Sequence, residues 1–334
     1  MAQENSFTSY WYAGLALDPI HVGTGGSRLG RVDNTIVRDP VTRIPKIPGS
    51  SLAGVTRAYV AMAKDKYPQC AGLGQPESDG TGGHCGKSDC PVCTVFGFAK
   101  GKDSSGGFAG LAAFSDMHVL LFPVATQKGP HWVTSPGAMR IAGINISIAD
   151  ENVVYHETES GYSLNLGWLM LPVKQYENQD KNEQDNNIWD KLKNKLAELD
   201  YIKGKVLLVS DKLFAHIVNS NLEIRTSVAI DPATGAAEDK ALFTYEALPR
   251  GTVLLWEVTC RNPKHFKISG RDITAVESPE TVRDIVAVAH SYLEHLGIGG
   301  MGSRGMGRLR VLNHQNPPGQ KRKTRRIHDE YSDP

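Results

Sequence analysis

Two glycine-rich segments, near opposite ends of the chain, constrain its fold more than any other feature. The first covers residues 21–57, HVGTGGSRLGRVDNTIVRDPVTRIPKIPGSSLAGVTR, and the second covers residues 297–311, GIGGMGSRGMGRLRV. Glycine lets backbone amides approach a polyanion closely, and the interspersed arginines offer planar donors for phosphate oxygens. The two segments therefore predict a fold that presents two phosphate-binding loops, as in a nucleic-acid-binding protein.

The charge pattern is local rather than global. The formal net charge is +1, so the whole chain has no basic excess. Residues 295–326 nevertheless contain eight arginines and lysines and no acidic residue, whereas residues 175–200 contain seven acidic residues and four lysines. The sequence KRKTRR lies in residues 316–334, which we predict to be a basic flexible tail; a disordered solubilising end would have the same composition.

The length, the apolar runs and the cysteine content of the chain limit the classes of protein to which it can belong. The chain has no apolar run approaching ~18 residues, so we expect no membrane partner and a cytoplasmic location. Five cysteines in a cytosolic chain of 334 residues argue against a disulfide framework. This length provides enough core for one large domain or two smaller ones.

Hydrophobic periodicity predicts an α+β fold with an antiparallel sheet, because strands and helices are interspersed without the regular alternation of a barrel. Alternating apolar residues predict strands at 7–17, 111–122, 162–171, 205–210 and 254–259. Helices are predicted at 50–64, capped by Ser50 or Ser51, at 188–200, and at 279–296, capped by Ser278. A DPATG turn predicts a long hairpin at 225–247.

A cysteine cluster lies in residues 65–107, a segment that we interpret as an insertion because it has little periodicity. Cys85, Cys90 and Cys93 have the spacing C-x4-C-x2-C, and three thiolates need one more ligand for tetrahedral zinc. Cys70 and His84 are the two candidates, and His84 would be strained because it adjoins a ligand. We expect a structural Zn²⁺, because the insertion has little apolar content on which to fold. The alternative is a loop with reduced thiols.

Two strings resemble nucleotide-binding motifs without the required context. The GKS at residues 86–88 is not a P-loop, since Thr81 occupies the position of the first glycine. Residues 300–305 match G-x-G-x-x-G but follow a predicted helix and precede a strand, the reverse of a dinucleotide site. Because residues 297–308 contain six glycines and two arginines, we interpret this loop as a phosphate cradle rather than only a tight turn.

Asp33 and His21 are the candidate reactive side chains of the first glycine-rich segment. Asp33, which lies between Arg31 and Arg38, could bind a hydroxyl or a magnesium ion, or act as a base near a scissile phosphate. The composition of the surrounding loop, taken alone, is more typical of an aspartate that stabilises a turn or a cap and pairs with a neighbouring arginine. His21 is either a general acid or base, or a histidine packed in a loop.

Six segments between residues 14 and 311 resemble the RAMP superfamily of CRISPR proteins. In chain order they are GLALDPIHVGTGG, GRVDNTIVRDPVTRIPKIPGSSLAGVTR, CGKSDCPVCTVFG, FSDMHVLLFPVATQKGPHWVTSP, IRTSVAIDPATGAAEDKALFTYEALP and GIGGMGSRGMGRLRV. The chain is most similar to the backbone subunit of type III-B (Cmr-type) effector complexes, with the type III-A backbone subunit second. LLFPVATQKGPHWVTSP and ALFTYEALP favour the Cmr type.

The resemblance implies an RRM-like (ferredoxin-like) palm within a single domain over residues 1–315, with a zinc-binding insertion at 65–107 and a thumb hairpin at 222–250. It implies several copies in a helical filament along a CRISPR RNA (crRNA) guide, together with other type III subunits. The thumb would displace one guide–target base pair at regular intervals.

The resemblance also assigns roles to residues. Asp33 occupies the place of the aspartate that cuts target RNA with a divalent metal, Mg²⁺ or Mn²⁺, which reverses the interpretation from composition. The residues expected to contact RNA are His21, Gly25, Gly26, Arg28, Arg31, Arg38, Ser50, Ser51, Arg57, Gly299, Gly300, Ser303, Arg304 and Arg308. Two alternatives remain: a structural guide-binding subunit that does not cut, and a metal-independent guide-processing ribonuclease that uses His21.

Overall fold

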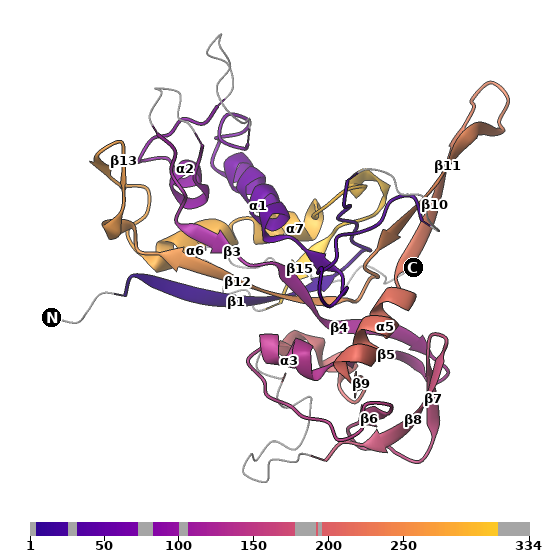
Figure 1. Cartoon of the computed structure of the whole chain (residues 1–334). Coiled ribbons are helices and arrows are strands. Elements are labelled where there is room, and N and C mark those ends of the chain that lie inside the picture. The colour runs from indigo at the N-terminus through magenta and orange to yellow at the C-terminus, as the bar shows by residue number, and fades with distance from the viewer. Residues whose placement is uncertain are drawn as a thin grey trace, which may run out of the picture.

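A large mixed sheet organises the molecule, as the α+β prediction requires. The computed structural model describes residues 5–25, 32–72, 83–99, 106–177, 192 and 196–312. In this part of the chain the strand order is β15-β1-β12-β4-β5-β9-β6-β8-β7, with β2 beside β4 and β3 beside β12. Figure 1 shows β4 passing between an upper half, built on β1 and β12, and a lower half that contains β5 to β9.

The upper half of the sheet separates two hydrophobic cores. β1 (Phe7–Ala16) pairs antiparallel with β12 (Val253–Arg261) and with β15 (Leu309–Val311). Because successive side chains of a strand point to opposite faces, Tyr12 and Trp256 lie in one core, and the adjacent Ala13 and Leu255 lie in the other. The strands predicted at 7–17 and 254–259 are therefore confirmed.

The remaining strands of this region are shorter or bent. The sequence predicted one strand at 111–122, and the structure has two, β3 (Ala112–Phe114) and β4 (Met117–Thr126). β3 pairs with β12, and β4 pairs both with β12 and with β2 (Lys46–Ile47). The break lies at Ser115 and Asp116, whose side chains bond elsewhere: Asp116 accepts from the backbone of Gly49, and the Ser115 hydroxyl accepts from the N–H of Glu257.

Four helices cover one face of the upper half (Figure 1). They are α1 (Gly49–Ala63), α2 (Pro91–Phe96), α6 (Pro279–Ala287) and α7 (His290–His295). The predicted helix at 50–64 is confirmed, but the prediction that Ser50 or Ser51 caps it is wrong. The N-cap is Pro48, and the Asp116 carboxylate accepts from the N–H of Gly49 at 2.8 Å, so a residue distant in sequence supplies the cap.

The predicted helix at 279–296 is divided into α6 and α7. Ser278 caps it as predicted, in a capping box with Thr281. At the division, the N–H of Ala289 bonds to the carbonyl of Val286, three residues back instead of four. This tight turn places the ring of His290 edge-on against Tyr12, with centroids 5.1 Å apart. Packing against β1 therefore accompanies a break that helical periodicity does not reveal.

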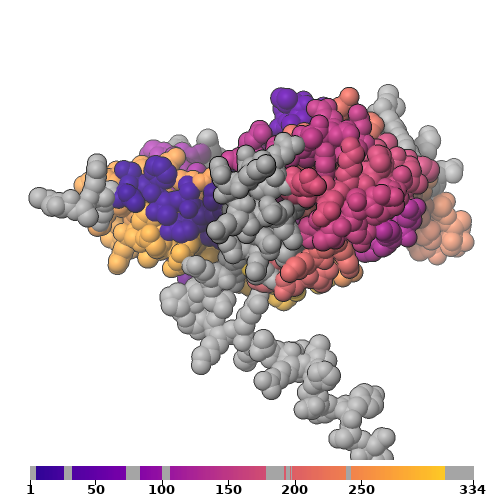
Figure 2. Space-filling view, turned by 90° about the horizontal axis from the view of Figure 1, so that it is seen from below, coloured from indigo at the N-terminus to yellow at the C-terminus, as the bar shows by residue number. Residues whose placement is uncertain are grey.

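The lower half combines strands β5 (Gly129–Thr134), β6 (Val154–His156), β7 (Ser163–Leu166), β8 (Leu169–Gln175) and β9 (Val206–Leu208) with helices α3 (Pro136–Ile141) and α5 (Asp211–Ser220). Figure 2, seen from below, shows this magenta part as one block. The pairs β5–β9 and β6–β8 are parallel, so the prediction of an antiparallel sheet is incomplete.

The strand predicted at 162–171 is a hairpin, β7 and β8. Gly167 has φ +64°, a left-handed conformation that suits a two-residue turn, and Trp168 beside it is 93% exposed. The alternation Leu164, Leu166, Trp168, Met170 continues through the turn in the sequence, so it does not show where the chain reverses. The predicted strand at 205–210 is confirmed as β9.

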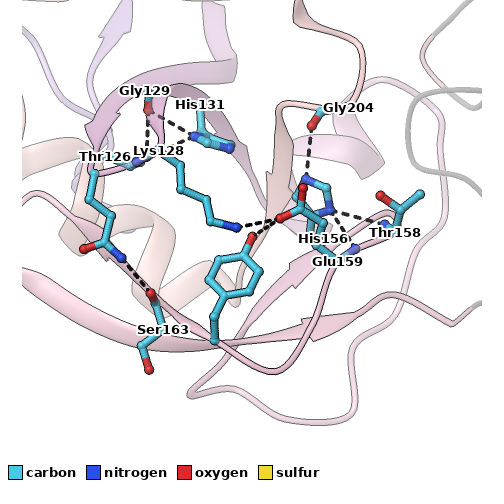
Figure 3. Close-up of polar contacts among 11 residues, drawn as sticks. Thr126, Lys128, Gly129, His131, His156, Thr158, Glu159, Ser163 and Gly204 are labelled. Atoms are coloured by element: carbon cyan, nitrogen blue, oxygen red, sulfur yellow. Dashed lines mark hydrogen bonds and ion pairs between the residues drawn. The ribbon is translucent and has the colours of Figure 1, made fainter.

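A polar cluster ties the β4–β5 turn to the β6–β7 connection (Figure 3). The carboxylate of Glu159 accepts from Lys128 Nζ and from the Tyr162 hydroxyl, each at 2.8 Å. His156 Nδ1 accepts from the backbone N–H groups of Thr158 and Glu159, and Nε2 lies 3.0 Å from the carbonyl of Gly204. Because that carbonyl can only accept, the His156 proton is on Nε2. These contacts hold three connections of the lower half together and so stabilise it.

The hairpin predicted at 225–247 is confirmed and projects from the body of the molecule (Figure 1). It consists of β10 (Glu223–Ile230) and β11 (Ala237–Ala247), which pair antiparallel around the predicted DPATG turn. Asp231 stabilises the turn by accepting from the N–H of Ala233 and the hydroxyl of Thr234.

Short elements complete the described chain. They are the strands β13 (Lys267–Ile268) and β14 (Arg271–Asp272) and the 3-10 helices Ala197–Ile202, Pro263–His265 and Gly302–Arg304. The helix predicted at 188–200 lies largely outside the described residues, as does the whole predicted tail at 316–334. Among the described residues, no helix is both long and apolar enough to cross a membrane.

Candidate nucleic-acid interface and metal centre

Asp33 is held by the base of the β10–β11 hairpin. Its Oδ2 accepts hydrogen bonds from the backbone N–H of Thr244 at 2.8 Å and from the Thr244 hydroxyl at 2.9 Å. The backbone N–H of Asp33 donates to the same hydroxyl at 3.2 Å. The Thr244 N–H, followed by the hydroxyl, lowers the pKa of Asp33 because both bonds favour the ionised carboxylate. Among the described residues, its partner is this threonine and not an arginine.

Backbone hydrogen bonds fix the segment that follows Asp33 on both sides. The N–H of Asn34 donates to the carbonyl of Thr244, and the N–H of Glu246 donates to the carbonyl of Asn34, both at 3.0 Å. On its other side the segment pairs with residues 22–24 through further backbone bonds. The first glycine-rich segment is thus joined directly to β11.

His21 lies where three segments meet. Its ring is buried, and Nδ1 lies 2.6 Å from the carbonyl oxygen of Glu246, so Nδ1 carries a proton. The ring also packs edge-on against Tyr245, with centroids 5.8 Å apart. Its own carbonyl accepts from the N–H of Gly300 at 2.9 Å. This environment matches the packed-histidine alternative.

The second glycine-rich segment closes over His21. A Cβ on Gly299 would lie 2.3 Å from the His21 carbonyl oxygen, and Gly299 has φ +92°, so this position requires glycine. Further along, Met306 is buried against Tyr245 and Ala247 of β11. Both glycine-rich segments, which the sequence singled out separately, therefore converge on the base of the hairpin.

Two of the predicted RNA-binding arginines are engaged within the chain. Arg38 forms an ion pair with Glu246 at 2.9 Å and donates to Asn219 at 2.9 Å. Arg308 makes a two-bond ion pair with Asp18, which raises the pKa of Arg308 and lowers that of Asp18. Arg38 thus braces the hairpin base, whereas Arg308 is half exposed and keeps one face toward solvent.

Other predicted contact residues are exposed or half-buried. Arg304 and Ser303 lie on the surface of the second glycine-rich segment, and the guanidinium of Arg304 makes a weak contact with the sulfur of Met301 at 3.8 Å. Gly25 and Ser50 are exposed and Ser51 is half-buried, so these positions are accessible to a polyanion. Gly26, Arg28 and Arg31 lie outside the described residues.

A second site is formed by four thiols, two in the segment between α1 and α2 and two at the start of α2. The Sγ atoms of Cys70, Cys85, Cys90 and Cys93 all lie within 4.8 Å of one another. Cys93 Sγ is 3.5 Å from Cys85 Sγ and 3.7 Å from Cys70 Sγ. Tetrahedral zinc with Zn–S bonds of ~2.3 Å requires sulfurs ~3.8 Å apart, so this donor set fits one ion. Hydrogen bonds from Cys85, then Cys90 and Cys93, lower the pKa of the Cys70 thiol.

The structure places Cys70 in this cluster, whereas His84 lies beside it. Arg57 donates through one nitrogen to His84 Nδ1 at 2.8 Å and through Nε to the carbonyl of Cys70 at 2.7 Å. Burial lowers the pKa of Arg57, and the thiols of the cluster oppose that shift. Arg57, predicted to contact RNA, therefore has one donor committed to Cys70 of the cluster and another to the adjacent His84.

Sequence reasoning did not find Thr244 or Glu246. Both lie in ALFTYEALP, the segment that favoured the Cmr type, but nothing in its pattern shows that these two side chains face residues more than 200 positions away. The signal that was available is their position near the end of a predicted hairpin strand, where a chain returns to the body of the protein.

The comparison with protein families agrees with the resemblance seen in the sequence. The family model "RAMP superfamily" matches residues 15–310. The chain therefore belongs to the RAMP superfamily.

The proteins similar to this chain include two CRISPR endoribonucleases. One is the CRISPR system Cms endoribonuclease Csm3 of Methanothermobacter thermautotrophicus, 37% identical over 90 residues, which cover 26% of this chain and 32% of that protein. Another is the CRISPR system Cmr endoribonuclease Cmr4 of Pyrococcus furiosus, 25% identical over 251 residues, or 71% of this chain and 76% of that protein.

Solved structures show the same fold. A chain of the type III-B Cmr-beta complex bound to cognate target RNA matches with a TM-score of 0.60 and 15% identity, covering 92% of this chain and 99% of that chain. A crystal structure of Cmr4 matches with a TM-score of 0.54 and 17% identity, covering 91% and 98%. At identities of 15% and 17%, this similarity shows a common fold and nothing further.

Proposed function

We propose that this chain is a crRNA-binding backbone subunit of a type III CRISPR effector complex, most like the Cmr type, and that it cleaves complementary target RNA. The observation that carries the proposal is the convergence of Asp33 and both glycine-rich segments on the base of the β10–β11 hairpin. Membership of the RAMP superfamily and similarity to the endoribonucleases Csm3 and Cmr4 support it.

The binding role follows from the type of groups exposed. The exposed side chains of Arg304 and Ser303, on the second glycine-rich segment, offer donors that can bind phosphates and carry no base specificity. A subunit that binds any guide needs such contacts, because base pairing reads the target sequence. We propose that the upper half is an RRM-like palm, that the β10–β11 hairpin is its thumb, and that several copies and other type III subunits assemble along the guide in the cytoplasm.

The cutting role is assigned to Asp33. A target nucleotide displaced at the hairpin would have a kinked backbone, which can align its 2′-OH with the adjacent phosphate. Asp33 Oδ1 makes no hydrogen bond to any described residue and would face that backbone. A Mg²⁺ or Mn²⁺ ion can be bound by one carboxylate together with RNA phosphates, and when bound it would stabilise the developing charge. Asp33 would hold this ion or the 2′-OH proton.

We also propose that Cys70, Cys85, Cys90 and Cys93 hold a structural Zn²⁺. The fit of four sulfurs to a tetrahedral ion supports this, and so does the clustering of four reduced thiols. The ion would link the end of α1 to α2 and would have no open position for chemistry.

Substitution of Asp33 tests the function. We expect Asp33→Asn, assembled with guide RNA and the other subunits, to lower the cleavage rate at least about 100-fold while guide and target binding stay unchanged. Asp39→Asn is the matched control, because Asp39 also accepts from a threonine N–H and hydroxyl, those of Thr42. It should cut normally.

Three outcomes would contradict the proposal. Full cleavage by Asp33→Asn would remove Asp33 from the reaction. A wild-type complex that binds target and leaves it intact would favour the structural subunit. Cleavage of repeat RNA by the isolated chain, surviving EDTA, would favour the guide-processing ribonuclease.

A further inference from the structure

We infer that Thr244 is the positioning residue of the Asp33 carboxylate, fixing Oδ2 to β11 so that Oδ1 is presented to RNA in one direction. The inference rests on the proposed function, since it assigns a task to Thr244 only if Asp33 acts on the target.

The Thr244 hydroxyl has two roles at once. It donates to Asp33 Oδ2 at 2.9 Å and accepts from the Asp33 backbone N–H at 3.2 Å. A hydroxyl combines one donor with acceptor lone pairs, so serine could replace it, whereas valine, which has the same shape as threonine, could perform neither role. The second bond also fixes the backbone from which the carboxylate extends.

The backbone of Thr244 is committed to the same segment. Its N–H donates to Asp33 Oδ2 at 2.8 Å, and its carbonyl accepts from the N–H of Asn34 at 3.0 Å. All polar groups of Thr244 thus bind residues 33 and 34. Across the hairpin Thr244 faces Thr226 of β10 in the antiparallel register, so the platform under Asp33 is a paired strand and not a loop.

This arrangement makes the carboxylate move with the hairpin. The element proposed to displace a target nucleotide is then the element that orients the group acting on the adjacent phosphate. Reacting groups held to within about 0.5 Å act far faster than loosely held ones, and misplacement by about 1 Å can cost 100-fold. Thr244 would secure that precision without touching RNA.

Three variants of the assembled complex test the role. We expect Thr244→Val to lower the cleavage rate at saturating target roughly 10- to 100-fold with target affinity unchanged, and Thr244→Ser to restore most of the rate. Thr42→Val is the matched control, because it removes an equivalent bond from a threonine hydroxyl to the carboxylate of Asp39 at 3.1 Å. It should cut at the wild-type rate.

The results separate this inference from the function on which it rests. If Asp33→Asn is inactive and Thr244→Val cuts normally, the positioning role is wrong and the function stands. If Asp33→Asn cuts normally, the function itself fails. A Thr244→Ser variant no faster than Thr244→Val, or a loss of target affinity as large as the loss of rate, would also overturn the positioning role. Thermal unfolding of both Thr244 variants shows whether either one has a folding defect. If Thr244→Val is misfolded, the cleavage rate of Thr244→Ser tests the positioning role.

Discussion

The cysteine cluster and the hairpin-base site are built in opposite ways. Three of the four thiols lie within residues 85–93, and the fourth, Cys70, is 15 residues before Cys85. The hairpin-base site instead joins Asp33 to Thr244 across 211 residues and His21 to Glu246 across 225. The first can form from local chain closure, whereas the second exists only when the whole sheet has folded.

The contrast also shows how each site would fail. On the proposed zinc role, loss of one thiol should change stability and metal content together, because the ion would organise the segment around it. A disturbed contact at the hairpin base should displace RNA-facing groups while the core survives. The following substitutions test whether the two sites are separable in this sense.

The largest expected effect comes from the cysteine cluster. Cys93→Ser should abolish stoichiometric zinc and destabilise the chain by more than about 4 kcal/mol, because Cys93 is fully buried and is proposed to be one of four zinc ligands. Elemental analysis and thermal unfolding measure both effects. The control is Cys260→Ser, a buried cysteine outside the cluster, which should retain zinc. Unchanged stability in Cys93→Ser would exclude a structural metal.

Next is the contact between the second glycine-rich segment and His21. Gly299→Ala should lower the free energy of unfolding by about 3 kcal/mol. The new Cβ would lie only 2.3 Å from the His21 carbonyl oxygen, and alanine would be forced into a left-handed backbone conformation. The adjacent Gly300→Ala is the control: its Cβ would have no neighbour closer than 3.6 Å, and the cost should stay below about 1 kcal/mol. Equal unfolding temperatures for the two variants would contradict the close approach.

A moderate effect is expected where Arg57 braces the cysteine cluster. Arg57→Met keeps the aliphatic stem but removes the bonds to Cys70 and His84, so we expect a loss of about 2 kcal/mol with zinc retained. Lys66→Met, at an exposed neighbouring position, should be neutral. If Arg57→Met instead lowered RNA affinity without changing stability, Arg57 would belong to the RNA interface as the sequence suggested.

The smallest effect concerns the ion pair between Asp18 and Arg308. Hydrogen bonds from Arg308, opposed by burial, leave the pKa of Asp18 below its ordinary value. A lowered folded-state pKa stabilises the protein above the unfolded pKa of about 4, and this contribution is lost as the pH falls through the folded pKa. Because the pair is partly exposed, we expect about 0.5 kcal/mol. The unfolding free energies of wild type and Asp18→Asn should differ by about this amount at pH 7 and by less at pH 3.

Local sequence patterns predicted correctly those elements whose ends are fixed by residues nearby in the sequence. The β10–β11 hairpin follows from its turn residues, and the start of α6 follows from Ser278 and Pro279. The patterns did not predict the cap of α1, which Asp116 provides, nor the division between α6 and α7, where packing on Tyr12 intervenes. They also missed the reversal at Gly167, because the alternation of apolar residues continues through it.

The sequence by itself determined the chemistry available to this protein: glycines that admit a polyanion, four thiols able to surround one ion, and an aspartate in a glycine-rich loop. The tertiary structure decided how these groups are used. It placed Cys70, and not His84, within 4.8 Å of the other three thiols, directed Arg38 and Arg57 into the protein, buried His21, and set Thr244 beneath Asp33. The physical reason is that hydrogen-bond partners are fixed by distance in space, and these partners come from segments that only the folded sheet brings together.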